Sequence, residues 1–132
     1  MIVVDTSALI AIAQDEPERA DFTRRIGLDG EAVAPASAYV EASMVLDARY
    51  GAGGPAIFEA MLRRLQNAGL TVYPFDSACA EIARHAFRTY GKGRHPAALN
   101  FGDCLVYATA KALDAPLLFK GEDFGQTDIA RA

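Results

Sequence analysis

The sequence has no excess of basic residues and only two cysteines. Its 132 residues include 13 lysines and arginines against 17 aspartates and glutamates, which gives a formal net charge of −4. A strongly basic nucleic-acid footprint is therefore absent from the chain as a whole, and such a partner would need a local basic patch or metal ions that offset the acids. Cys79 and Cys104 have neither CxxC spacing nor a histidine at zinc-ligating spacing, so we expect two buried free thiols.

Segments typical of export, membranes or nucleotide binding are also missing. The chain starts with "MIVVD", without a basic stretch or a cleavage site, so no signal peptide is expected. Apolar runs stay well short of 18 residues, because Lys111 and Asp114 interrupt the best candidate. We therefore expect a cytoplasmic protein that does not enter a membrane. GxGxxG and GxxxxGK[ST] are both absent, so neither a dinucleotide site nor a P-loop is indicated.

The remaining composition is that of an ordinary globular protein. Hydrophobic residues make up 52% of the chain and charged residues 23%, and a chain of this length buries roughly two thirds of its unfolded surface. We therefore predict a single domain over residues 1–132.

Strand-like and helix-like segments alternate along the chain. Ser7, Asp15, Ser37 and Asn100 are candidate helix caps. The alternation predicts an α/β fold with a mostly parallel sheet covered by helices on both faces. The predicted strands span 2–4, 31–35, 71–75 and 116–119, and the predicted helices span 7–13, 16–28, 38–50, 55–68, 77–90 and 101–113.

Four acidic residues occupy related places in this pattern. Asp5 ends the first strand and Asp123 lies just past the fourth, whereas Glu41 and Asp103 lie in the first turns of helices. Parallel strands direct their carboxyl ends to one edge, where open α/β sheets bind their ligands. The sequence therefore predicts that the four carboxylates converge at that edge.

Such a cluster is costly without a cation. Two like charges at ~4 Å repel by about 4 kcal/mol at an effective dielectric of 20. A hard divalent ion relieves this repulsion, and oxygen donors alone favour Mg²⁺, for which Mn²⁺ can substitute, over zinc. A bound ion of this kind lowers the pKa of a water and stabilises charge on a phosphoryl oxygen. This chemistry is typical of nucleases.

Each acid also has a purely structural interpretation. Asp103 follows Asn100 by three residues, as an acid in the first turn of a helix does. Asp5 can cap the next helix, and Asp123 can form a turn. Glu41 lies on an apolar helix stripe, where a solvated glutamate is not expected. The convergence of all four favours a metal site over four separate structural roles.

Four stretches carry a family resemblance. "VVDTSALIAI" at 3–12, "ASAYVEASMVL" at 36–46, "LNFGDCLVYATA" at 99–110 and "LLFKGEDF" at 117–124 resemble the PIN-domain ribonucleases, and most closely the VapC toxins of toxin–antitoxin pairs. The resemblance implies a three-layer α/β/α fold and Mg²⁺-dependent RNA cleavage. It also implies a small VapB-type antitoxin that blocks the site, a toxin homodimer, and a heterotetramer or larger assembly with the antitoxin.

The resemblance also assigns roles to individual positions. It implies two principal metal ligands, two further acids that complete the site, and a hydroxyl that supports them: Asp5 and Asp103, Glu41 and Asp123, and Thr6 or Ser7. Asp128 resembles an acid found in part of the family, but a capping role in the tail is expected for it here.

A short basic stretch is a candidate RNA contact. Arg84, Arg88, Lys92 and Arg94 fall within eleven residues and can track a phosphate backbone beside the acids. A solvated helix face followed by a polar loop explains the same residues.

Other functions remain open from the sequence alone. A response-regulator receiver domain would use Asp76 and Lys120, but it leaves Glu41 and Asp103 unexplained. A haloacid-dehalogenase phosphatase needs an aspartate where Ser7 stands. A housekeeping PIN nuclease without a toxic role and a non-enzymatic interaction module are the remaining alternatives.

Overall fold

The structure, a computed structural model, describes all residues from 1 to 132. Strands and helices alternate as predicted, and most boundaries fall within one or two residues of those expected. The elements are β1 (Ile2–Val4), α1 (Thr6–Ala13), α2 (Arg19–Asp29), β2 (Ala32–Pro35), α3 (Ala36–Tyr50), η1 (Gly51–Gly53), α4 (Gly54–Asn67), β3 (Leu70–Tyr73), α5 (Ser77–Tyr90), α6 (Phe101–Ala112), β4 (Leu117–Leu118) and η2 (Phe124–Gln126).

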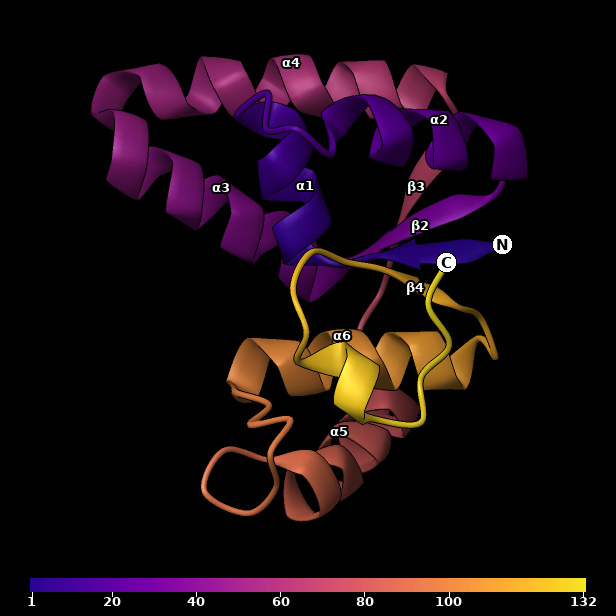
Figure 1. The fold of residues 1–132 in the computed structure, drawn as a ribbon. Coiled ribbons are helices and arrows are strands. Elements are labelled where there is room, and N and C mark those ends of the chain that lie inside the picture. The colour runs from indigo at the N-terminus through magenta and orange to yellow at the C-terminus, as the bar shows by residue number, and fades with distance from the viewer.

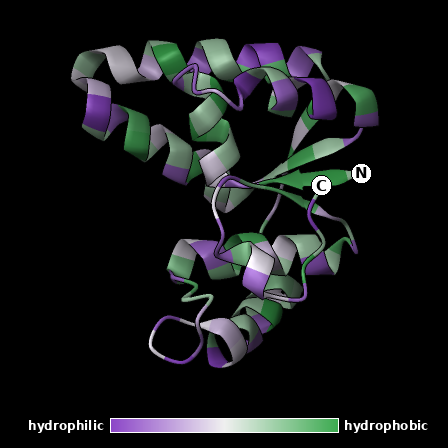
Figure 2. Ribbon diagram, in the orientation of Figure 1, coloured by the Kyte–Doolittle hydropathy of each residue, from purple (hydrophilic) through white to green (hydrophobic).

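A four-stranded parallel sheet separates two layers of helices. The strand order is β3-β2-β1-β4, and every neighbouring pair is parallel. Helices α1 to α4 cover one face, whereas α5 and α6 cover the other (Figure 1). β1 and β2 are buried along their whole length, as expected for parallel strands covered on both faces, and β1 is strongly hydrophobic in Figure 2. The predicted three-layer α/β/α fold is confirmed.

The two helical layers and the sheet share one hydrophobic core. Its 35 buried residues come from both sides of the sheet. Cys79 and Cys104 are both buried and unpaired, as predicted. No helix combines the length and the hydrophobicity that crossing a membrane requires.

The helix starts differ from the predictions in three of four cases. Asn100 caps α6 as predicted, but Asp5 rather than Ser7 caps α1. Asp15 is not a cap, because it adopts a left-handed φ of 55° in the turn before α2. Ser37 lies inside α3, which follows β2 without a linker, and its buried hydroxyl has no hydrogen-bond partner.

The C-terminal tail after η2 is attached to the edge of the sheet. The amide of Leu117 in β4 donates to the carbonyl of Ala130 at 2.8 Å, and the amide of Ala132 donates back to Leu117 at 2.9 Å. These bonds place Arg131 beside β4 as an isolated parallel bridge. The tail therefore covers an edge that would otherwise expose unpaired backbone groups.

Candidate metal centre

An acidic cavity of about 280 Å³ lies at the carboxyl edge of the sheet. Asp5 enters it from the end of β1, Glu41 from α3 and Asp103 from the first turn of α6. The hydroxyl residues Thr6 and Ser7 line the same cavity. The structure thus brings together three of the four predicted acids, contributed by the sheet and by both helical layers.

Asp5 is the most buried of these acids, with 5% of its surface exposed. The amide and the hydroxyl of Ser7 donate to Asp5 Oδ2 at 3.0 and 2.5 Å, which caps α1 and leaves Oδ1 free of hydrogen bonds. Burial, and to a smaller extent the charges of Asp103 and Glu41, raise the pKa of Asp5 to about 6, although the hydrogen bonds from Ser7 lower it. A buried carboxylate in this position has too little compensation for its charge.

Ser7 connects Asp5 to the segment that follows β4. Its hydroxyl donates to Asp5 and accepts a hydrogen bond from the amide of Lys120 at 2.9 Å. The residue therefore holds the end of β1 against the start of the turn that leads to Asp123. Thr6 is buried beside it, with 8% of its surface exposed.

Asp103 completes a capping box with Asn100. The amide of Asp103 donates to Asn100 Oδ1 at 2.9 Å, and the amide of Asn100 donates to Asp103 Oδ2 at 3.0 Å. Burial raises the pKa of Asp103, and so do the charges of Asp123 and Glu41, while the bond from Asn100 lowers it. A helix start normally favours an ionised acid. The raised pKa of Asp103 therefore reflects its burial first and the neighbouring negative charges second. The capping box uses only Oδ2 and leaves Oδ1 free of hydrogen bonds.

Glu41 reaches the cavity because Gly102 has no side chain. A Cβ at position 102 would overlap Glu41 Oε2, so the carboxylate lies directly against the first turn of α6. Glu41 makes no hydrogen bond or ion pair with another side chain. The expectation of a buried apolar stripe around it was wrong, since Met44 is 64% exposed and Glu41 itself is exposed.

Asp123 lies beside the cavity and does not line it. It is exposed at the start of η2, yet it is close enough for its charge to raise the pKa of Asp103. No three His, Cys, Asp or Glu side chains already form a ligand cluster around one point. To ligate a single ion, the acids would therefore have to rotate.

The donor chemistry of the cavity fits a hard divalent cation. Asp5, Glu41 and Asp103 present carboxylate oxygens only, and each keeps at least one oxygen free of hydrogen bonds. Lys120 also lines the cavity, but its ammonium pairs with Glu16 at 3.1 Å and Glu18 at 3.2 Å. None of the three acids forms an ion pair with a basic side chain, although Arg49 also lines the cavity. Their negative charge is therefore not compensated by a direct ion pair, as in oxygen-rich metal sites.

Three charged residues of the cavity were not assigned to the metal site from the sequence. Glu16 lies 104 residues from Lys120, so no local spacing could reveal their pairing. Lys120 was noted only for the receiver-domain alternative. Arg49 also lines the cavity, as do Glu41 and Val45 of the same helix. These three residues follow one another at intervals of four, a helical spacing that could have indicated the shared face.

The predicted RNA-contact residues largely come together in a second hollow. Arg84, Arg88 and Arg94 line a groove of about 750 Å³ between α5 and α6, together with Phe87 and Phe101. The Arg94 guanidinium lies 5.3 Å from the centre of the Phe87 ring. Phe101 is 79% exposed and is the first residue of α6, two positions before Asp103. Lys92 is exposed and does not line the groove.

Asp128 lies outside the acidic cavity. It accepts hydrogen bonds from the Tyr107 hydroxyl at 2.6 Å and from Lys111 Nζ at 3.0 Å, both on α6. These bonds lower the pKa of Asp128. Its observed role is to attach the C-terminal tail to α6.

Solved structures share this fold at low sequence identity. VapC20 of Mycobacterium tuberculosis, described as a sarcin–ricin loop cleaving toxin, superposes with a TM-score of 0.76 at 14% identity, covering 100% of this chain and 98% of its own. FitAcB from Neisseria gonorrhoeae gives a TM-score of 0.64 at 19% identity, covering 99% and 96%. These two likenesses concern the fold alone.

Sequence relatives are much closer. Ribonuclease VapC30 of Mycobacterium tuberculosis is 43% identical over 129 residues, covering 98% of this chain and 96% of the relative. Ribonuclease VapC of Mycolicibacterium smegmatis is 42% identical, covering 98% of both chains. The family model described as "PIN domain" matches residues 2–130. The chain therefore belongs to the PIN-domain family and, within it, to the VapC ribonucleases.

Proposed function

We propose that this nuclease is a Mg²⁺-dependent endoribonuclease and the toxin of a VapBC pair. The observation that carries the metal dependence is the acidic cavity, where Asp5, Glu41 and Asp103 lie together and none of them forms an ion pair with a basic side chain. Membership of the VapC ribonucleases supports RNA as the substrate, and a receiver domain is excluded by the same relationship.

The roles of the acids follow from their surroundings. Asp5 and Asp103 would hold the ion through the oxygens that their caps leave free, with Glu41 from the opposite helical layer and Asp123 from the side. Ser7 keeps the Asp5 carboxylate oriented through two hydrogen bonds to one oxygen. A bound ion supplies an activated water and stabilises the charge that develops on the phosphate.

The side chains nearest the acids are poorly suited to act as nucleophiles. The Ser7 hydroxyl donates to Asp5 and accepts from Lys120, so its hydrogen bonds serve the structure. Burial raises the pKa of the Cys104 thiol to about 11, which leaves almost no thiolate at neutral pH. An activated water is therefore the better candidate for attack on the phosphodiester.

The groove between α5 and α6 is a suitable path for the RNA. Its arginines can contact phosphates, and Phe87 and the exposed Phe101 offer surfaces on which unpaired bases can stack. Phe101 and Asp103 both lie in the first turn of α6, so the groove and the acidic cavity both reach the start of this helix. RNA bound there would present its backbone to the proposed metal site.

An antitoxin is the proposed protein partner. Val40 and Met44 flank Glu41 on α3 and are 54% and 64% exposed. Apolar side chains beside a charged cavity suit a partner that covers both. The homodimer and the larger toxin–antitoxin assembly implied by the family resemblance remain predictions.

The metal dependence and the role of Glu41 are tested together. Wild-type protein should cleave single-stranded RNA with Mg²⁺ or Mn²⁺ and should lose this activity in EDTA. Glu41→Gln should lower the rate by orders of magnitude even with Mg²⁺, because a ligand charge is lost. Asp47→Asn, an exposed acid on the same helix outside the cavity, should retain the wild-type rate. Undiminished cleavage in EDTA would exclude the metal mechanism.

The pKa of Asp5 predicts a pH-dependent stability of the metal-free protein. The folded value is about 6 against 3.8 for the free side chain, so the folded state binds this proton more tightly. The resulting stabilisation is complete below about pH 4 and is lost as the pH rises through 6. Asp5→Asn does not titrate and can still cap α1. In EDTA at pH 7.5 it should be more stable than wild type, by on the order of 1–3 kcal/mol.

Urea unfolding followed by circular dichroism at several pH values measures this difference. The advantage of Asp5→Asn should shrink as the pH falls towards 4, and Asp47→Asn should show no such trend. The rise in melting temperature on adding Mn²⁺ should be smaller in Asp5→Asn than in wild type, since a ligand charge is gone. An Asp5→Asn variant that is less stable than wild type in EDTA at pH 7.5 would contradict the inferred destabilisation by the buried Asp5 charge.

The role of the groove predicts a selective loss of RNA affinity. Arg88→Ala and Phe101→Ala should each raise KM for a single-stranded RNA several-fold and leave kcat nearly unchanged, because they remove phosphate and stacking contacts. Arg63→Ala, an exposed arginine of α4 in the opposite layer, is the matched control. Unchanged KM in both groove variants would show that the RNA takes another path.

The proposed partner is tested by expression in cells. The chain alone should arrest growth, and co-expression of the small antitoxin from the same operon should restore growth and copurify with the chain. Glu41→Gln should be harmless when expressed alone. Harmless expression of the active wild-type enzyme would instead indicate a housekeeping PIN nuclease.

A further inference from the structure

The segment between β4 and Asp123 is held by side chains on both of its flanks. On one flank the amide of Lys120 donates to the Ser7 hydroxyl, which itself binds Asp5. On the other flank lies Arg131 of the C-terminal tail. The turn between them passes through Gly121, whose φ of 102° places it in the left-handed region, and it leads to Asp123 two residues later.

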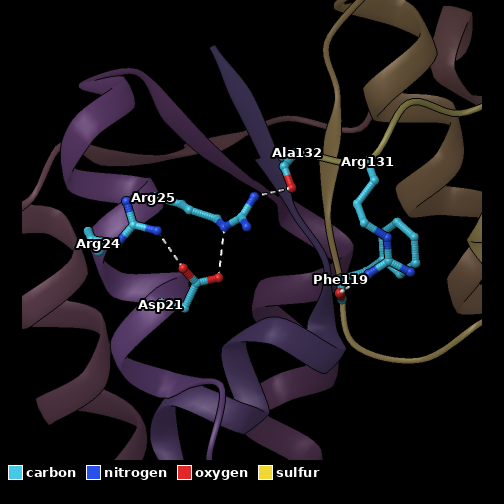
Figure 3. Close-up of polar contacts among 6 residues, drawn as sticks. All are labelled: Asp21, Arg24, Arg25, Phe119, Arg131 and Ala132. Carbon is cyan, nitrogen blue, oxygen red and sulfur yellow. Dashed lines mark hydrogen bonds and ion pairs between the residues drawn. The ribbon is translucent and has the colours of Figure 1, made fainter.

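Arg131 makes three contacts with this segment, and Figure 3 shows its guanidinium stacked over the ring of Phe119. The Cζ atom lies 3.8 Å from the ring centre. One terminal nitrogen donates to the Phe119 carbonyl at 3.3 Å, and the other donates to the Gly121 carbonyl at 3.0 Å. The guanidinium has no carboxylate partner. Its observed role is to fix the backbone that leads to Asp123.

The tail that carries Arg131 is itself anchored at several points. The Ala132 carbonyl accepts a hydrogen bond from Arg25 of α2 at 2.7 Å, and Asp21 binds Arg25 at 2.8 Å (Figure 3). Asp128 joins the tail to α6 through Tyr107 and Lys111. Both helical layers therefore determine where the Arg131 guanidinium lies.

We propose that Arg131 is a positioning residue of the metal centre. By bracing the segment from Phe119 to Gly121 it keeps Asp123 beside Asp103, and this raises the affinity of the acidic cavity for a divalent cation. This inference rests on the proposed function, in which Asp123 helps to hold the ion. A planar guanidinium can stack on a ring and donate to two carbonyls at once, which a lysine ammonium cannot reproduce.

The sign of the effect separates positioning from electrostatics. Arg131 carries a positive charge near an anionic cavity, so its removal acting through charge alone would tighten cation binding. Loss of bracing should instead weaken it. Groups that orient metal ligands from outside the coordination sphere typically contribute roughly tenfold or more to metal affinity. We therefore expect Arg131→Ala to bind Mn²⁺ roughly tenfold more weakly than wild type.

Mn²⁺ affinity of the purified full chain, measured by electron paramagnetic resonance of the free ion, provides a readout independent of cleavage. Arg131→Ala and Arg131→Lys should both bind Mn²⁺ more weakly, because lysine restores the charge and not the two-carbonyl contact. Arg24→Ala, whose side chain pairs with Asp21 and does not touch the tail, should bind as wild type does. Circular dichroism checks that each variant is folded. If Arg131→Ala is unfolded, the affinity of Arg131→Lys decides the test.

A double-mutant comparison tests whether Arg131 acts through Asp123. Arg131→Ala should cause no further loss of Mn²⁺ affinity in the Asp123→Asn background. Unchanged or tighter binding by the folded Arg131 variants, or an equal loss in both backgrounds, would overturn the positioning role. The proposed metal site has its own test, because Asp5→Asn and Asp103→Asn should weaken Mn²⁺ binding whatever Arg131 does.

Discussion

Repulsion among carboxylates that form no ion pair with a basic side chain is the constraint on which this structure depends. Asp5 and Asp103 cannot move apart freely, because each also caps a helix through one of its oxygens. Lys120, the nearest ammonium, is engaged by Glu16 and Glu18. The fold thus maintains a concentrated negative charge that no direct ion pair relieves, and an external cation is the simplest means of relieving it.

The topology explains why the charge gathers at this place. β1 lies between β2 and β4 in the sheet, and the chain leaves β1 into the layer of α1 but reaches β4 from α6 in the other layer (Figure 1). The helices therefore separate to opposite faces between β1 and β4, and a crevice forms at the carboxyl ends of such strands. Ser7 spans this crevice, since it binds both Asp5 and the amide of Lys120.

Local patterns predicted the parts of the site that lie at element ends. Continuous apolar runs located the strands, and strand direction then placed Asp5, Glu41 and Asp103 at one edge. Asn100 was recognised as a cap from its spacing to Asp103. The contacts of Ser7 and Arg131 with the segment after β4 were not predictable in this way. Arg131 lies close to Phe119 in sequence, but no spacing rule indicates that its side chain folds back.

The wrongly predicted helix caps show that the residue types preferred at helix starts do not by themselves locate those starts. Asp15 and Ser37 are of a type that commonly begins helices, but the start of α2 is displaced by a left-handed turn and α3 continues directly from β2. Asp123 was expected among the other acids and lies beside them, because its position depends on the turn through Gly121 and not on a strand end. Long-range packing decides both outcomes, and the sequence pattern carries little of that information.

The first three residues of α6 limit which sequences can carry this site. Phe101 extends into solvent, Gly102 leaves room for the carboxylate of another helix, and Asp103 combines a cap with the acidic cavity. The site thus uses three adjacent positions in a fixed order: a side chain that extends into solvent, a residue without a side chain, and an acid. Exchanging Gly102 with either neighbour would preserve composition and local helix preference almost unchanged. The arrangement would nevertheless be lost, because any side chain at position 102 would meet the Glu41 carboxylate and displace it from the start of α6.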